Sequence, residues 1–186
     1  MGRRIACAGL ALAFSTLACT MDLGGPASPG EPIPTSETAA QEILDAWKSA
    51  AGAFPATGEV RLLITESQLT SLVAARLAES NDPVLREPQV YLRQGQLQIY
   101  GRMQQGPFEG SVLLSISPLV KPDGTLAFEL TSADLGPVPA PEGVKDSLSA
   151  LITEAFAGPF GSLATGLRLT SIAIEDGEMA LVGVLR

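Results

Sequence analysis

The stretch Val90–Gly101, with the sequence VYLRQGQLQIYG, has the pattern of a β-hairpin. Apolar residues alternate with other residues on both sides of Gln94-Gly95, and the glycine provides the positive φ that a two-residue turn requires. A turn of this length places Leu92 opposite Leu97 on the inner face of the hairpin. Tyr91 and its polar neighbours form the other face, which we expect to be solvated.

The segment Ile172–Gly183, IAIEDGEMALVG, repeats this pattern without a gap. The turn glycine, the terminal glycine and one apolar stripe coincide, so Ile174 is predicted to lie opposite Met179. Two explanations fit the likeness: an internal duplication, or two good hairpins that obey the same local rules. The outer face of this second hairpin is made of small and apolar residues, which makes a helix a candidate to cover it.

Other segments extend these hairpins into a larger sheet. Strands are expected at about 59–64, 89–93, 96–104, 108–120 and 125–135, and a last hairpin at about 167–175 and 178–185. Turns that contain glycine separate most of them. Several strands exceed the usual five or six residues, which favours a long, strongly curved antiparallel sheet of about six to seven strands.

Helices are predicted at three places. Thr38 and Gln41 have the spacing of a capping box, which predicts a helix over about 36–53, and Thr65 and Gln68 predict a second helix in the same way. A third helix is expected to begin near Pro141 and to end before Gly158. The fold class is therefore α+β, with the curved sheet packed on two to three helices in a single domain over residues 36–186.

The N-terminus has the pattern of a secretory signal over residues 1–18, with Arg3-Arg4 before an apolar run too short to span a bilayer comfortably. The run ends in Leu17-Ala18-Cys19, which resembles a bacterial lipobox and predicts lipidation of Cys19. An ordinary cleaved signal and a retained anchor are the alternatives. Residues 19–35 are rich in Pro and Gly, which predicts a flexible or semi-extended tether. The expected location is extracytoplasmic, with lipid anchoring to a bacterial membrane.

Composition excludes several classes of function. The 186 residues include 12 basic and 20 acidic side chains and no histidine, for a net charge of −8. Zinc sites and nucleophilic triads that use histidine therefore lack parts, and the acidity argues against nucleic-acid binding. Removal of the signal would take away Arg3 and Arg4 and change the net charge to −10. Such a body favours a position held away from anionic headgroups.

The acidic residues offer no catalytic constellation. Glu175-Asp176 reads as a solvated hairpin tip, Glu42 and Asp45 as an exposed helix face, and Glu129 as an outward residue between two inward ones. Trp47 is expected in the core and the two tyrosines on the surface of a strand. We therefore predict a protein that is not an enzyme and that uses no metal or other cofactor.

Four short motifs resemble bacterial envelope proteins of the YpmS-like and LmeA-like phospholipid-binding kind. They are Ile64–Leu69 (ITESQL), the hairpin Val90–Gly101, Asp134–Pro139 (DLGPVP) and Ile172–Gly177 (IAIEDG). The resemblance implies half of a tubular lipid-binding module, in which a long antiparallel sheet wraps a helix and leaves an apolar groove. It implies no catalytic residue. This chain has a lipobox where YpmS-like proteins have an N-terminal membrane helix.

Inward-facing apolar residues of the expected strands are the candidate lining of such a groove: Leu97, Ile99, Val112, Leu114, Ile116, Phe128 and Leu130. Long strands with few charges suit a site for an acyl chain. The same residues suit a filled core equally well, because composition does not separate a hollow interior from a filled one.

Two functions follow from these observations. The first is a membrane-anchored lipoprotein that binds or hands on a lipid-like apolar ligand, such as a phospholipid or fatty acid. The second is a tethered protein-interaction domain with a closed core and no small ligand. A cavity that accommodates an acyl chain favours the first function, and a solid core with a large exposed apolar patch favours the second. The sequence identifies no protein partner.

Overall fold

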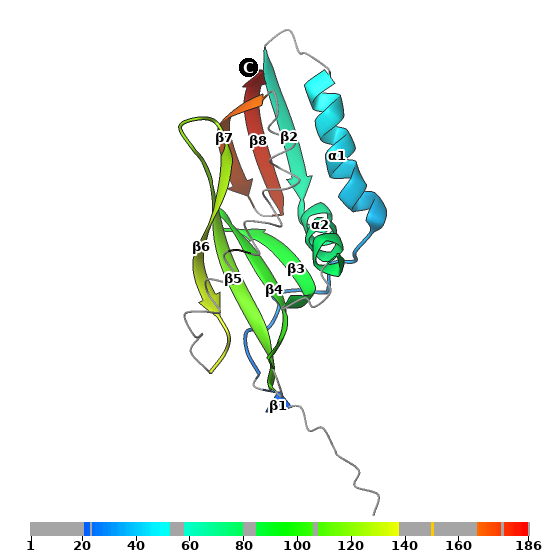
Figure 1. Ribbon diagram of the computed structural model, residues 1–186, viewed down its shortest axis with the longest axis vertical. Helices are drawn as coiled ribbons and strands as arrows, with labels where there is room; N and C mark the ends of the chain where they lie inside the picture. The colour runs from blue at the N-terminus through cyan, green and yellow to red at the C-terminus, as the bar shows by residue number, and fades with distance from the viewer. Residues whose placement is uncertain are drawn as a thin grey trace, which may run out of the picture.

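The computed structural model describes residues 21–22, 24–52, 58–79, 85–105, 108–137, 150, 167–175 and 177–185. The elements are β1 (Met21–Asp22), α1 (Glu37–Gly52), β2 (Glu59–Thr65), α2 (Glu66–Ala78), β3 (Leu85–Arg93), β4 (Gln96–Gln105), β5 (Phe108–Val120), β6 (Leu126–Asp134), β7 (Leu167–Glu175) and β8 (Glu178–Leu185). The molecule is elongated, with β5 running along the long axis (Figure 1). The predicted third helix lies outside the described residues except for Ala150, which is helical.

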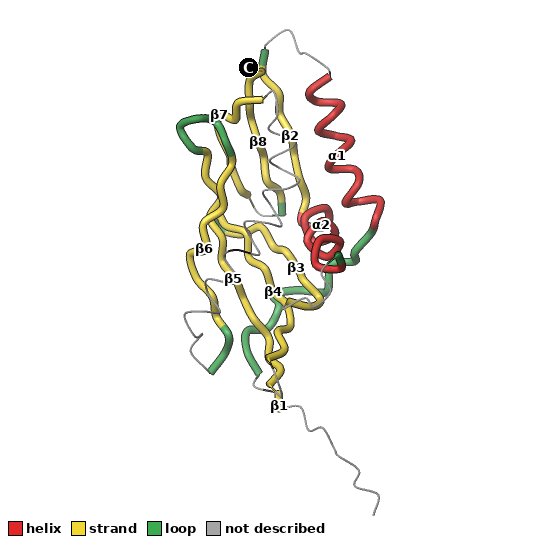
Figure 2. Tube along the Cα trace, viewed as in Figure 1, coloured by secondary structure: helices red, strands yellow, loops and turns green. Residues whose placement is uncertain are grey.

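The strands form two sheets. The larger sheet has the order β1-β5-β4-β3, with β6 also paired to β5, and the smaller sheet has the order β2-β8-β7. All pairs are antiparallel except the short parallel pair of β1 and β5. Helices α1 and α2 lie beside the strands, with α1 along β2 and α2 between β2 and β3 (Figure 2). The α+β class is confirmed.

The prediction of one long curved sheet was wrong. Val90 and Leu92 occupy positions of β3 where an antiparallel ladder directs the backbone N–H away from β4. Side chains of α2 accept these N–H groups, so α2 takes the place of a further strand at the edge of β3. Meanwhile β2, from the beginning of the domain, pairs along its whole length with β8 at the end. The second sheet arises from this long-range pairing.

Local features of the chain match the prediction closely. The register pairs Leu92 with Leu97 and Ile174 with Met179, as two-residue turns require. Strand β3 begins at Leu85, earlier than expected, and a register shift between Arg86 and Gln89 interrupts its pairing with β4. The two hairpins that share a sequence pattern lie in different sheets.

Each helix begins at a side-chain cap. The predicted capping box at α2 is present, because Thr65 Oγ1 accepts from the Gln68 backbone and Gln68 Oε1 accepts from the Thr65 backbone. At α1 the expected box of Thr38 and Gln41 is replaced by Ser36, whose Oγ accepts the N–H of Ala39 at 3.4 Å. Because Ser36 precedes the helix directly, α1 begins one residue before Thr38.

Hydrogen bonds between described residues join the sheets at two places. At one, the turn between β5 and β6 meets the start of β7: the Gly124 carbonyl accepts from Leu169 N–H at 3.0 Å, and the Pro122 carbonyl accepts from the Arg168 guanidinium at 3.2 Å. At the other, the Gly177 N–H in the turn between β7 and β8 donates to the Leu92 carbonyl at 3.1 Å. One cluster of buried apolar residues runs through both sheets and α2.

Residues 24–36, which we refer to as the strap, lie on the larger sheet. Gly24 O accepts from Ser111 N–H at 3.0 Å, and Gln89 makes two hydrogen bonds with the backbone of Ile33, at 2.5 and 3.3 Å. The Pro and Gly content predicted a flexible or semi-extended tether over residues 19–35, and these contacts hold its described part against the sheet. The strap also explains why Tyr91, which was predicted to be solvated, is buried. None of the helices within the described ranges is long and apolar enough to cross a bilayer.

Candidate functional site

The residues predicted to line a groove share one face of the larger sheet. Leu97 pairs with Ile116 and Ile99 with Leu114, and Ile116 pairs in turn with Leu130 on β6. Because side chains of directly paired residues point to the same face, this register places the set together. Val112 lies two residues before Leu114 on β5, and Phe128 lies two residues before Leu130 on β6, so both keep the same face. The structure thus brings together all the predicted residues.

Burial divides this set into two groups. Leu97, Ile99, Val112, Leu114 and Ile116 are at most 2% exposed and belong to the core. Phe128 and Leu130 are half-buried and pack against that core. The first group stabilises the fold by excluding water, whereas the second group still has surface that a ligand is able to cover. That these residues line a ligand groove remains a prediction.

Further half-buried apolar residues accompany Phe128 and Leu130. We define the apolar margin as the half-buried apolar residues on the inner faces of β6 and β7: Leu126, Phe128, Leu130, Ala133, Ile172 and Ile174. Within the described part of the chain, β6 pairs only with β5 and β7 only with β8, so both are edge strands. The sequence analysis placed Ile174 on an inner face, opposite Met179, but did not include Ile172 or Ile174 among the residues of the groove.

Few polar groups are buried beneath the apolar margin. Among the described residues, Thr70, Ser71 and Ser115 are the buried polar ones, and no buried side-chain nitrogen or oxygen there lacks a hydrogen-bond partner. The acids considered for catalysis lie elsewhere: Glu129, Glu175, Glu42 and Asp45 are exposed, and Asp45 pairs with Lys48. The described residues of this face are suited to contact with hydrocarbon.

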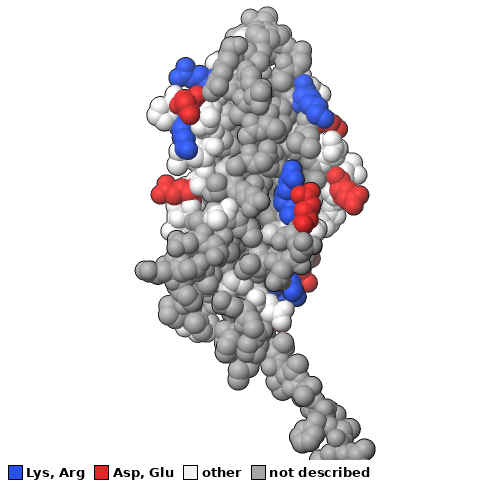
Figure 3. All heavy atoms as spheres, viewed as in Figure 1, with Lys and Arg blue, Asp and Glu red and all other residues white. Residues whose placement is uncertain are grey.

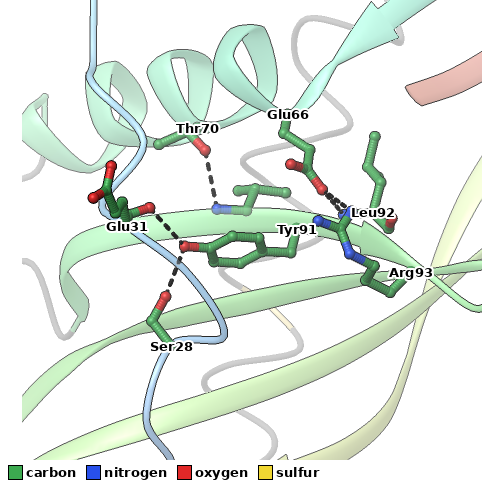
Figure 4. A network of polar contacts seen from close by, with 8 residues as sticks. Ser28, Glu31, Glu66, Thr70, Tyr91, Leu92 and Arg93 are labelled. Carbon is green, nitrogen blue, oxygen red and sulfur yellow. Dashed lines mark hydrogen bonds and ion pairs between the residues drawn. The ribbon is translucent and has the colours of Figure 1, made fainter. Parts of the chain in front are cut away.

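A group of polar contacts, which we refer to as the polar junction, joins the edge of β3 to α2 (Figure 4). Glu66 Oε1 accepts from the backbone N–H of Leu92 at 2.7 Å and also binds the Arg93 guanidinium. The Glu66 N–H donates to the Gly177 carbonyl at 3.3 Å, and the Gly177 N–H returns to Leu92, which closes a ring of contacts between α2, β3 and the β7–β8 turn. One helical turn later, Thr70 Oγ1 accepts from the N–H of Val90 at 3.0 Å.

The sequence contained a signal for this junction that the prediction did not use. Glu66 and Thr70 are four residues apart and therefore lie on one face of α2. Val90 and Leu92 are two residues apart, so their outward N–H groups lie along one edge of β3. A helix with an acceptor every turn thus matches a strand with a donor every second residue. The pairing requires contact between distant segments, which local patterns do not specify.

A second feature is a cavity of about 530 Å³ beside the register shift of β3. Its lining combines the strap, the second half of α2 and the beginning of β3: Ile33, Pro34, Thr35, Ala74, Leu77, Ala78, Leu85, Arg86, Glu87, Pro88 and Gln89. Glu87 has a φ of 49°, which is rare for a residue other than glycine. Arg86 lies directly opposite Arg102, and Arg102 pairs with Glu109 at 2.8 Å.

The charges on the surface are mixed. On the face shown in Figure 3, basic and acidic side chains lie beside one another among the described residues. The ion pairs of the described residues include Arg76–Glu79 and Lys48–Asp45. No group of three or more Cys, Asp or Glu residues suited to a metal ion occurs in the ranges that the structure describes. The side chain of Trp47 and all of Cys19 lie outside those ranges.

The chain was compared with known families and with curated proteins. The sequence model of the LmeA-like phospholipid-binding family matches residues 40–184, which is more than half of the chain. The match covers most of α1, all of α2, the strands from β2 to β7, nearly all of β8 and the apolar margin, but not β1. The comparison with curated proteins returned no match.

Proposed function

Because this chain belongs to the LmeA-like phospholipid-binding family, we propose that it binds a phospholipid through the apolar margin of β6 and β7. The resemblance inferred from the short motifs is thereby confirmed for the LmeA-like family. The family is a lipid-binding family and not an enzyme family. Lipid anchoring at Cys19, extracytoplasmic location and transfer of the bound lipid are further parts of the proposal.

The half-buried state of the apolar margin carries this proposal. Phe128, Leu130 and Ile172 are half-buried and pack against the buried apolar cluster. An acyl chain that lies along them therefore removes apolar surface from water, and the buried cluster does not have to separate. Each 100 Å² of such surface contributes roughly 2.5 kcal/mol, and an acyl chain covers more than that. Within the described residues β6 and β7 are edge strands, and the proposed route of the lipid to the margin runs along these two edges.

The test uses residues 20–186, which retain every described residue. Native mass spectrometry and organic extraction after expression in a bacterial envelope are expected to find a phospholipid at a stoichiometry near one. Leu130→Ser, on the apolar margin, is expected to lower uptake from phosphatidylethanolamine–phosphatidylglycerol vesicles about ten-fold, because one leucine contact is worth roughly 1.5 kcal/mol or more.

Leu119→Ser is the matched control. Leu119 is 36% exposed on β5, next to β6, and its side chain points to the opposite face of the same sheet. This variant is expected to bind lipid like the parent protein. A protein that is free of lipid and takes up none from vesicles would refute the proposal. In that case the burial of Leu97, Ile99, Val112, Leu114 and Ile116 favours the tethered interaction domain with a closed core.

Lipid anchoring at Cys19 and transfer of the bound phospholipid are tested by separate measurements. The N-terminal peptide of the mature protein is expected to carry a diacylglycerol on Cys19, with two acyl chains that make membrane attachment stable. Cys19→Ala is expected to release the protein from membranes. Transfer predicts that the protein moves a fluorescent phospholipid from donor to acceptor vesicles, and that Leu130→Ser slows this movement while Leu119→Ser does not.

A further inference from the structure

The strap fixes where the N-terminus of the mature protein leaves the domain. In β1, Met21 is aligned with Phe108 and Asp22 with Glu109, in a parallel pair at the very start of β5. Gly24 then accepts a hydrogen bond from Ser111, and the chain continues over the sheet. The N-terminus is therefore attached at the end of the larger sheet where β4 passes into β5 (Figure 1).

The attachment is close and continuous. A Cβ on Gly25 would overlap the Ser111 carbonyl, and a Cβ on Gly136 would lie 2.9 Å from Gly25 Cα, so the strap is packed between two segments of the domain. Further along, Ser28 Oγ lies 2.7 Å from the Tyr91 hydroxyl, and the Ser36 N–H donates to Ser71 Oγ at 3.1 Å. These contacts run from β5 across β3 to α2. Because the strap is bound at all these points, the domain does not rotate freely about it.

Only Thr20 separates Cys19 from β1. Two residues of fully extended chain span at most about 7 Å. A diacylglycerol on Cys19 would therefore hold the start of β5 near the bilayer surface. We propose that the end of the larger sheet formed by the β4–β5 connection faces the membrane, and that the long axis points away from it. This orientation rests on the proposed lipid anchor.

The length of β5 determines how far the other end of the molecule lies from the bilayer. From Phe108 to Val120, a rise of about 3.3 Å per residue carries the chain roughly 40 Å. The turn between β5 and β6, with Lys121 exposed, therefore stands about that far from the bilayer, and so does the start of β7 that this turn contacts. The smaller sheet lies at the distal end.

The charges at this end are mixed. Arg86 lies directly opposite Arg102 on β3 and β4, and Arg102 pairs with Glu109 at 2.8 Å. Glu87 adjoins Arg86 in the chain, and Asp22 is aligned with Glu109. The orientation therefore rests on the anchor and on the strap, not on charge.

The orientation is measurable with the complete lipoprotein in vesicles. Both native cysteines are accounted for, because Cys7 leaves with the signal and Cys19 carries the lipid, so an introduced cysteine is the sole thiol. Gln104→Cys places a fluorophore on the exposed end of β4, and Lys121→Cys places it on the distal turn. The vesicles contain phosphatidylcholine, phosphatidylglycerol and a lipid with a nitroxide on its headgroup.

The label at position 104 is expected to be quenched at least five-fold more strongly than the label at position 121. Equal quenching, or stronger quenching at position 121, would overturn the orientation. Flotation with the vesicles and the mass of the N-terminal peptide are measured first. A protein without lipid on Cys19 refutes the anchor and the orientation together, whereas a lipidated protein with reversed quenching refutes the orientation alone. Lipid uptake by residues 20–186 is unaffected by either result, so phospholipid binding is judged separately.

Discussion

Thr70 supports the edge of β3 through one hydrogen bond. Its Oγ1 accepts the Val90 N–H at 3.0 Å, and both residues are fully buried. Thr70→Val keeps the shape of the side chain but leaves this N–H without an acceptor, at a cost of about 1–3 kcal/mol. Urea unfolding is expected to show this loss. Thr70→Ser keeps the hydroxyl and is expected to cost less. Equal losses for the two variants would show that shape, not the hydrogen bond, matters here.

Gly124 is a second residue with a testable role, at the contact between the sheets. Its φ is 80°, close to the 75° of Gly95 in the β3–β4 turn, so an alanine has similar backbone strain at both positions. Only at Gly124 would the new Cβ overlap Arg168 Cγ and lie 3.2 Å from Arg168 Cα.

Gly124→Ala is therefore expected to destabilise the protein by about 1–3 kcal/mol more than Gly95→Ala, because β7 must shift to make room. The midpoint of thermal unfolding is the measurement. If the two substitutions have the same effect, the contact between Gly124 and β7 contributes nothing beyond turn geometry.

At the scale of elements, the strap makes the clearest prediction. The Ile33 N–H donates to Gln89 Oε1, so its exchange with solvent deuterium is expected to be slow, whereas a free tether exchanges at once. Gln89→Ala removes both hydrogen bonds to Ile33 and is expected to speed this exchange at least ten-fold. Gln98→Ala, the same change on the outer face of the neighbouring β4, should leave it unchanged. Fast exchange of Ile33 in the parent protein would contradict the clamped strap.

The elements also show which features of the fold local sequence patterns predict and which they do not. The Gln94-Gly95 turn fixed the register of Leu92 with Leu97 in advance, and Thr65 with Gln68 fixed the start of α2, because each depends on neighbours in the chain. The pairing of β2 with β8 joins segments more than a hundred residues apart, and no turn encodes it. The strap misled the prediction for a related reason. Its Pro and Gly content is that of a linker, and its partners Gln89 and Tyr91 are distant in sequence.

In the candidate site, too, local patterns predicted only part of the arrangement. Alternation along β5 and β6 placed Leu114, Ile116 and Leu130 on one face correctly. It did not separate the buried residues from the half-buried ones, because burial depends on which strand is at the edge of the sheet. Leu130 lies on the edge strand β6 and keeps accessible surface, whereas Leu114 lies on β5 between two neighbours. The topology therefore decides which residues remain for a ligand.

For the whole molecule, the two sheets are expected to unfold as one unit. The buried cluster includes Leu97 in the larger sheet and Leu181 in the smaller one, and the ring at Glu66 ties α2 to both. Leu97→Ala and Leu181→Ala are each expected to cost about 2–5 kcal/mol. Because the core is shared, either variant should lower the deuterium-exchange protection of backbone amides in both sheets by a similar factor.

Leu63→Ala provides the matched control for this comparison. Leu63 is 55% exposed on β2, so its truncation is expected to change stability by less than about 0.5 kcal/mol. Independent sheets would give a different pattern, in which Leu181→Ala weakens protection in β2, β7 and β8 but leaves β3, β4 and β5 as before. A single unfolding unit matters for lipid binding, because the apolar margin is composed of β6 from one sheet and β7 from the other. A ligand that covers both strands is then expected to stabilise the entire fold, and added phospholipid should raise the protection of Leu97 and Leu181 amides together.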